Sequence, residues 1–120
     1  MKKLVLFLFL GFSSLFAFEE LTADNFDQKI ANKNVIIDFY AVWWGSCKVL
    51  ERNMTKYNTS KPDNVEIYKV DIEKEPALTR KYKAFAVPML VYIKNGEVLA
   101  KERGIKTVEQ LTNSVNKYFK

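Results

Sequence analysis

The sequence predicts an α/β fold in which a central mixed β-sheet is flanked by helices on both faces. Apart from Asp38, residues 35–40 and 89–93 are apolar throughout and rich in β-branched or aromatic side chains, as strands buried on both faces are. A helical segment joins the first run to a strand at residues 65–71, and a crossover of this kind makes a parallel pair. The dipeptide Asn95-Gly96 signals an antiparallel hairpin, which makes the sheet mixed.

The chain enters the fold through a helix and a strand. Thr22 and the acidic and amide residues after it favour a helix start, and Phe26 and Ile30 fall on one face of that helix. The strand at residues 35–40 follows, and its one acidic residue is Asp38. Burial disfavours a charged carboxyl group, so we expect the pKa of Asp38 to be raised.

The middle of the chain supplies a second helix, a strand and a third helix. Residues 46–57 predict the second helix, with Cys47 on its apolar side, and the polar stretch 58–64 ends it as a loop. The strand at residues 65–71 alternates in polarity, which predicts that only one of its faces is covered. Pro76 then opens a short helix, because proline is tolerated in the first turn.

The last third of the chain predicts a hairpin and a closing helix. Residues 89–93 form a strand, and Asn95-Gly96 turns the chain into a second strand that Gly104 ends. Residues 107–119 follow as an amphipathic helix. The apolar side of this helix is formed by Val108, Leu111, Val115, Tyr118 and Phe119.

Residues 1–17 have the layout of a secretory signal peptide, which leaves residues 18–120 as one domain. Lys2 and Lys3 precede a short apolar run, and Ala17 is a small residue at a candidate cleavage point. The apolar stretch is shorter than the roughly 20 residues that cross a bilayer, so an uncleaved membrane anchor is the weaker alternative. We therefore expect an exported protein, periplasmic or extracellular.

The composition argues against several classes of function. The formal net charge of +5 falls to +3 without residues 1–17, which is mild, and the sequence has no aromatic-studded basic stripe, so nucleic-acid binding is not indicated. No histidine is present, which argues against a zinc site and against Cys-His catalysis. We expect no metal and no cofactor. The one cysteine, Cys47, cannot form a disulfide within the chain, so a dithiol cycle would need sulfur from another molecule.

Several motifs resemble those of the thioredoxin family. Residues 21–27 look like that family's first helix entry, and residues 38–48 look like its active-site strand and turn. Val87-Pro88 resembles the family's cis-proline turn, and residues 94–98 and Gly104 resemble its hairpin and the glycine of its final strand. The resemblance implies the thioredoxin fold and descent from a protein of thiol-disulfide exchange.

The active-site motif is incomplete in this chain. The resemblance, which spans residues 19–120, places Trp44 at the position of the family's attacking cysteine and Cys47 at that of the resolving cysteine. A helix N-terminus favours a thiolate at Cys47, whereas a position one turn inward of Trp44 favours a shielded thiol. Cys47 is thus either a buried, inert thiol or a reactive monothiol.

The resemblance also implies roles for two charged residues. Asp38 matches the buried acid that exchanges a proton with the resolving cysteine, and Lys69 is its nearby charge partner. Cys47, Asp38 and Lys69 are therefore the candidate catalytic residues. The alternative is that Asp38 and Lys69 are an internal ion pair left by descent, because a proton relay is useful only if Cys47 reacts.

A candidate binding surface surrounds the active-site turn. We expect Pro88 to be cis and to expose the backbone of Val87, which in the family pairs with an extended peptide by strand addition. The alternative is a turn proline with no ligand role. Trp44 is either an exposed binding anchor or a lid over Cys47. The candidate substrate-binding residues are Trp43, Trp44, Gly45, Ser46, Val87 and Pro88.

Three functions remain open from the sequence. The first is an exported thioredoxin-like protein that binds extended polypeptides or protein thiols and forms mixed disulfides through Cys47, without a complete dithiol cycle. The second is a redox-inactive binding or chaperone module. The third is a monothiol disulfide reductase that takes the missing sulfur from glutathione or a partner oxidoreductase.

Overall fold

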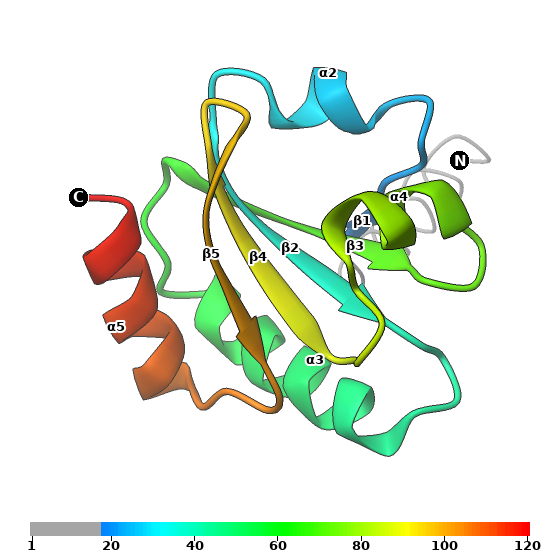
Figure 1. Ribbon diagram of the computed structural model, residues 1–120. Helices are drawn as coiled ribbons and strands as arrows, with labels where there is room; N and C mark the ends of the chain where they lie inside the picture. The colour runs from blue at the N-terminus through cyan, green and yellow to red at the C-terminus, as the bar shows by residue number, and fades with distance from the viewer. Residues whose placement is uncertain (1–17) are drawn as a thin grey trace, which may run out of the picture.

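Five strands and four helices follow one another along residues 18–120, the part of the chain that this computed structural model describes (Figure 1). The strands are β1 (Glu19–Glu20), β2 (Asn34–Tyr40), β3 (Val65–Asp71), β4 (Met89–Lys94) and β5 (Glu97–Arg103). The helices are α2 (Phe26–Ile30), α3 (Gly45–Asn58), α4 (Pro76–Tyr82) and α5 (Val108–Tyr118). The predicted signal peptide, residues 1–17, lies outside the described residues. No helix within residues 18–120 is both long and apolar enough to cross a bilayer.

All five strands belong to one mixed sheet with the order β1-β3-β2-β4-β5. β3 runs parallel to both β1 and β2, and the crossover from β2 to β3 is α3. β4 is antiparallel to β2, and β5 is antiparallel to β4. The predicted mixed sheet, with its parallel crossover pair and its hairpin, is confirmed.

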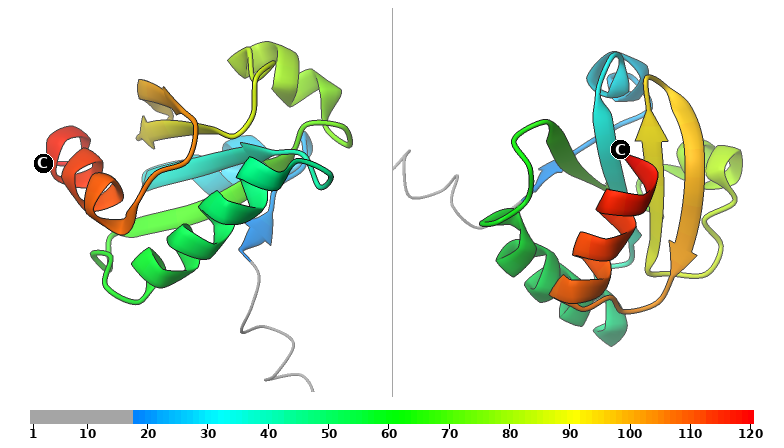
Figure 2. Two further views of the ribbon diagram at one scale, coloured as in Figure 1. Left: turned by 90° about the horizontal axis from the view of Figure 1, so that it is seen from below. Right: turned by 90° about the vertical axis from the view of Figure 1, so that its left-hand side faces the viewer.

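The sheet is buried on both faces because alternate side chains of its central strands enter two separate hydrophobic clusters. Ile36 and Leu90 belong to the cluster that α3 and α5 cover. Ile37 and Val91 belong to the cluster that α2 and α4 cover. Figure 2 shows α3 and α5 on one side of the sheet and α4 on the other. Asp38 shares the side of Ile36, since strand residues two apart point the same way, and therefore faces α3.

Local interactions define where elements begin and turn. The Thr107 hydroxyl accepts a hydrogen bond from the Gln110 backbone N–H at 3.1 Å, and the Thr107 N–H donates to the Gln110 side chain at 3.0 Å, which caps α5. Asn95 and Gly96 have φ angles of 52° and 82°, the conformation that a two-residue hairpin turn of this kind requires. The Val87-Pro88 peptide bond is cis, as predicted.

Three details differ from the sequence-based expectation. α2 begins only at Phe26, because the chain first makes a turn in which the Thr22 N–H donates to the Asn25 side chain at 2.9 Å. The prediction of a half-covered β3 is wrong: this strand lies between β1 and β2 and buries Ile67 on one face and Tyr68 on the other. β1 is not predicted from the sequence, because its two glutamates show no strand pattern. It joins the sheet through backbone pairing with β3.

Candidate functional site

Three loops meet at one edge of the sheet, the edge that is formed by strand ends rather than by an outermost strand. Residues 41–44 leave β2 there, the cis proline precedes β4 there, and β5 ends there. Strand pairing brings these loops together, because Phe39 of β2 pairs with Met89 of β4, and Met89 pairs with the last residue of β5. The N–H of Gly104 also donates to the carbonyl of Pro88 at 3.0 Å. The turn before α3 and the cis proline, both predicted to bind substrate, are therefore neighbours (Figure 1).

Cys47 lies in the first turn of α3 and is almost completely buried. Trp44 is the N-cap residue of this helix, and its N–H donates to the Ala41 carbonyl at 3.2 Å, which closes the turn. The N–H of Cys47 in turn donates to the Trp44 carbonyl at 3.1 Å. Cys47 is 3% exposed, whereas Trp44 is 44% exposed. The thiol thus lies inside the molecule while Trp44 reaches the surface.

Burial sets the protonation of this thiol. Loss of solvent raises the pKa of Cys47, a backbone hydrogen bond at Ala41 lowers it, and the charge of Asp38 raises it. The net direction is upward, so burial outweighs the preference of a helix N-terminus for a thiolate. Cys47 is therefore protonated at neutral pH, and its reaction needs a group that accepts the proton.

Asp38 is a buried acid that lines the same pocket as Cys47. It is 1% exposed, and its Oδ1 has no hydrogen-bond partner within residues 18–120. Burial raises the pKa of this carboxyl to about 7, with a further rise from Glu51 and an opposing effect from Lys69. A carboxyl group with such a pKa gains and loses its proton near neutral pH, as a proton acceptor for a thiol must.

Lys69 forms its ion pair with Glu51 rather than with Asp38. The sequence predicts Lys69 as the charge partner of Asp38, and the two residues are indeed cross-strand neighbours in β2 and β3. The Lys69 Nζ nevertheless lies 2.8 Å from Glu51 Oε2 and 4.9 Å from the centre of the Tyr40 ring. Sequence reasoning misses Glu51, although its place one turn after Cys47 on the same side of the helix is a signal that points to it.

A pocket of about 270 Å³ brings these groups together. It is lined by Glu20, Asp38, Tyr40, Ala41, Val42, Cys47, Lys48, Glu51 and Lys69. All three predicted catalytic residues therefore meet at one cavity, whereas neither Trp44 nor Pro88 lines it. Within the described residues, no group of three or more cysteine, aspartate or glutamate side chains is placed to hold a metal ion.

Five exposed apolar side chains lie in the loops at this edge of the sheet, and we call them together the edge patch. It consists of Val42, Trp43, Trp44, Phe85 and Ile105, all from the loops at this edge of the sheet. Trp43 and Phe85 are 61% and 69% exposed, and the rings of Trp43 and Trp44 meet edge to face with centroids 5.4 Å apart. Sequence reasoning names the two tryptophans but misses Phe85 and Ile105, whose signal is an apolar residue close to a loop proline or glycine.

The remaining predicted binding residues flank the edge patch. Gly45 and Ser46 begin α3, and Gly45 is exposed whereas Ser46 is half-buried. Val87 is half-buried and Pro88 is buried. The six predicted substrate-binding residues thus lie in the turn before α3, in the first residues of α3 and in the cis-proline loop, and the side chains of the two tryptophans are the most accessible.

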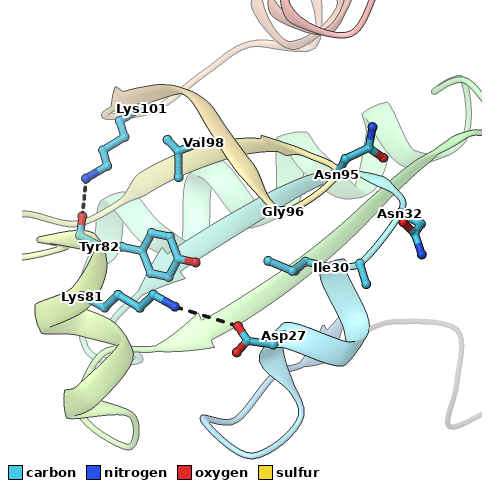
Figure 3. Close-up of a pocket in the computed structure, with 10 residues that line it drawn as sticks. Asp27, Ile30, Asn32, Lys81, Tyr82, Asn95, Gly96, Val98 and Lys101 are labelled. Atoms are coloured by element: carbon cyan, nitrogen blue, oxygen red, sulfur yellow. Dashed lines mark hydrogen bonds and ion pairs between the residues drawn. The ribbon is translucent and has the colours of Figure 1, made fainter.

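A second and larger pocket lies elsewhere, on the face that α2 and α4 cover (Figure 3). Its volume is about 600 Å³, and α2, α4 and the β4–β5 hairpin border it. Lys81 approaches Asp27 at 3.9 Å beside it, and the Lys101 ammonium donates to the Tyr82 carbonyl at 2.7 Å. None of the predicted catalytic or substrate-binding residues lines this pocket. Cavity volume alone therefore does not locate the candidate chemistry.

Known proteins resemble this chain over most of its described length. The family model described as Thioredoxin matches residues 17–117. A thioredoxin of Chlamydia pneumoniae is 33% identical over 98 residues, which cover 82% of this chain and 95% of the relative. The chloroplastic thioredoxin Y1 of Arabidopsis thaliana is 31% identical over 101 residues, and the match covers 82% of this chain and 59% of that longer relative.

A solved structure shares the fold. It comes from a study of the thiol-resolving mechanism of yeast mitochondrial 1-Cys peroxiredoxin through the glutathione and thioredoxin systems. Its TM-score is 0.76 at 27% sequence identity, and the match covers 84% of this chain and 95% of the other. The predicted thioredoxin fold is confirmed. The family match, the sequence identities and the shared fold agree, and this chain belongs to the thioredoxin family, a family of thiol-disulfide exchange.

Proposed function

We propose that this chain is an exported thioredoxin-family protein that binds extended polypeptides at its edge patch and forms transient mixed disulfides through Cys47. One juxtaposition carries the proposal: an exposed aromatic surface adjoins the cis proline, and the single thiol shares a pocket with a buried acid behind that surface. Because Cys47 is the only cysteine, the chain does not complete a dithiol cycle alone.

The edge patch has the chemistry of a peptide-binding surface. Exposed tryptophans combine a large apolar area with few rotatable bonds, and they are common anchors at interfaces. The 44% exposure of Trp44 favours its role as an anchor over that of a lid. By resemblance to the family, the backbone at Val87 would pair with an extended segment of the bound polypeptide.

The covalent step begins with loss of the Cys47 proton, because the thiolate is the nucleophile. Asp38 accepts that proton, and the Cys47 thiolate attacks one sulfur of a substrate disulfide. A disulfide between Cys47 and the substrate forms, and the other substrate sulfur leaves as a thiolate and takes up a proton. A second thiol, from glutathione or a partner oxidoreductase, then attacks the mixed disulfide and releases Cys47.

A second candidate is a redox-inactive binding or chaperone module. The burial of Cys47 and the raised pKa of its thiol favour this candidate, because both slow attack on a disulfide. The edge patch would bind polypeptides in the same way in either case. The two candidates differ only in whether Cys47 reacts in the folded protein.

The third candidate, a monothiol disulfide reductase, extends the mixed-disulfide step to turnover. The solved neighbour comes from work on thiol resolution through the glutathione and thioredoxin systems, which supports glutathione as the second thiol in our proposal. Turnover would then consume two molecules of glutathione for each substrate disulfide reduced to thiols, and would yield one molecule of oxidised glutathione.

The proposed export of the protein depends on residues 1–17. Its support is the basic start and apolar run of residues 1–17, followed by the matched domain from residue 17 onward. N-terminal sequencing of the protein recovered from the cell envelope or the medium tests it. Cleavage near Ala17 is expected, and an intact Met1 in a membrane fraction would instead support the anchored alternative.

Mixed-disulfide formation is tested by incubating the folded protein with oxidised glutathione and measuring its intact mass. We expect one glutathionyl adduct that dithiothreitol removes, and no adduct in the matched Cys47→Ser variant. A thiol that stays free until the protein is denatured would favour the redox-inactive candidate. Reduction of a disulfide peptide, assayed with and without glutathione, then tests turnover.

Polypeptide binding is tested with a fluorescent peptide that carries aliphatic side chains and no cysteine. Trp44→Ala should weaken binding by roughly tenfold, which corresponds to the loss of about 1.4 kcal/mol from one anchor. The matched control is Val98→Ala, which removes an exposed apolar side chain of β5 outside the edge patch. Equal affinity of the two variants would contradict the assigned surface.

A further inference from the structure

The charged groups beside Cys47 are not paired as their strand register suggests. Asp38 and Lys69 are direct cross-strand neighbours on the face of the sheet that α3 covers. The Lys69 Nζ instead lies 2.8 Å from Glu51 Oε2, while Asp38 Oδ1 has no hydrogen-bond partner among the described residues. The lysine is 13% exposed and the glutamate 37% exposed, so this ion pair lies at the mouth of the pocket rather than in its depth.

Lys69 has one further contact, with the ring of Tyr40. Its ammonium group lies over the Tyr40 ring, 4.9 Å from the ring centre, and the Tyr40 hydroxyl donates to Glu20 at 2.8 Å. The ring and the Glu51 carboxylate thus both contact the ammonium group. The charged and titratable groups that line the pocket with Asp38 are Glu20 of β1, Tyr40 of β2, Lys69 of β3, and Cys47, Lys48 and Glu51 of α3.

We propose that Glu51 is a positioning residue that holds Lys69 away from Asp38, so that the acid beside Cys47 remains able to exchange a proton with the thiol near neutral pH. An ammonium group close to Asp38 would stabilise the carboxylate and make it a weak base. Glu51 prevents this by offering the lysine a partner at the pocket mouth. The raised pKa of Asp38, to which Glu51 contributes and which Lys69 opposes, agrees with this geometry.

The role of Glu51 in catalysis rests on the proposed thiol chemistry, but its effect on Asp38 is measured without any disulfide. The experiment is a pH titration of the Asp38 carboxyl carbon by NMR in the folded chain. In Glu51→Gln, Lys69 is released toward Asp38, and we expect the titration midpoint to fall by about one pH unit or more. Glu20→Gln is the matched control, because it removes a carboxylate from the same pocket without releasing Lys69.

A double-variant cycle separates positioning from simple charge removal. Lys69→Met removes the ammonium group and keeps the length of the side chain, so Glu51→Gln in that background can act only through the loss of its own charge. We expect the shift caused by Glu51→Gln to be clearly smaller in the Lys69→Met background. Equal shifts in both backgrounds, or no shift in either, would overturn the proposal.

The thiol supplies a second readout. In Glu51→Gln the released Lys69 would offset part of the Asp38 charge, and because that charge raises the pKa of the thiol, the alkylation of Cys47 should move to lower pH. An Asp38 shift with no glutathionyl adduct at Cys47 would support the placement of Lys69 and contradict the thiol chemistry. A glutathionyl adduct at Cys47 with no Asp38 shift would support the thiol chemistry and contradict the placement of Lys69.

Discussion

Single side chains decide whether this site reacts. The Cys47 thiol and the Asp38 carboxyl are both buried and both hold a proton at higher pH than they would in water. Burial disfavours the thiolate and the carboxylate alike, so the pair shares one proton more readily than it releases both. The proposed thiol chemistry therefore depends on proton transfer between the two groups, and each group can be tested separately.

Asp38 makes the stability of the fold depend on pH. The pKa of its carboxyl rises from 3.8 to about 7 on folding, so between these values the folded state holds a proton that the unfolded state has lost. Stability from this group is full at low pH, falls as pH rises through this window, and is constant above it. At pH 8 the ionised, buried group costs about 4 kcal/mol, and Asp38→Asn should remove that pH-dependent loss.

Denaturant unfolding at pH 4.5 and pH 8 measures this difference. The quantity of interest is the change in unfolding free energy between the two pH values, which cancels the pH-independent cost of burying an amide. Asp63→Asn, in the exposed loop before β3, corrects for the general effect of removing one carboxylate. An Asp38→Asn variant that keeps the full loss seen in the wild type would show that the acid is not the source.

Cys47 should be alkylated slowly in the folded protein, with a rate that increases toward alkaline pH. Burial both blocks the reagent and raises the pKa of the thiol, so the midpoint of the rate profile should lie above the ordinary value of about 8.5. Iodoacetamide kinetics followed by mass spectrometry give this profile. The same protein in denaturant is the control, and a folded-state midpoint below that of the denatured chain would contradict the prediction.

Of the helices within residues 18–120, α5 is the one with side-chain hydrogen bonds at its N-cap. The Thr107 side chain and the Gln110 side chain each satisfy the other's backbone N–H, and Leu111 and Val115 then enter the core. Thr107→Ala should lower stability by about 1 kcal/mol, because it leaves one of these N–H groups without its partner. For a domain of this size, that corresponds to a Tm lower by about 4–8 °C.

A serine at position 107 separates the cap from packing. Thr107→Ser keeps the hydroxyl that accepts from the Gln110 N–H and removes the methyl group, so its Tm should stay close to that of the wild type. Thermal unfolding of the two variants by circular dichroism gives the comparison. Equal losses in alanine and serine would mean that the methyl group, not the cap, matters.

Elements with strong periodicity or a rigid turn residue are predictable from the sequence. β2 and β4 are continuous apolar runs, Asn95-Gly96 adopts the turn that its residue types favour, and Pro88 is cis as expected. β1 is too short and too acidic to carry a signal, and its pairing depends on where β3 lies in the sheet. β3 itself alternates in polarity along the chain, but its burial is set by neighbours that lie far away in sequence.

In the candidate site, too, some features are predictable from the sequence and others are not. The positions of Cys47, Asp38 and the proline turn follow from local motifs, and the fold brings them to one edge of the sheet. The partner of Lys69 does not follow, because the choice between Asp38 and Glu51 depends on side-chain reach across two elements. Phe85 likewise becomes part of the edge patch only when its loop is placed beside the turn before α3.

The two hydrophobic clusters share the central strands, which ties the halves of the molecule together. Side chains of β2 alternate between the cluster under α3 and α5 and the cluster under α2 and α4. Loss of packing on either face of the sheet therefore affects β2. This strand also contains Asp38 and leads into the turn before Cys47. We expect the domain to unfold as one cooperative unit, with no state in which only one face is packed.

Matched truncations on the two faces test this cooperativity. Leu50 on α3 and Leu78 on α4 are both buried, one in each cluster, and Leu→Ala at either site should cost about 2–5 kcal/mol. Because Trp43 and Trp44 lie next to α3, their fluorescence should report mainly that side, whereas far-UV circular dichroism reports the whole domain. In urea, the two signals should change together in both variants, because losing either cluster frees the shared strands. If the circular dichroism signal of Leu78→Ala changes at a lower urea concentration than its tryptophan fluorescence, the two faces unfold independently. The site at the end of β2 would then survive loss of the opposite face.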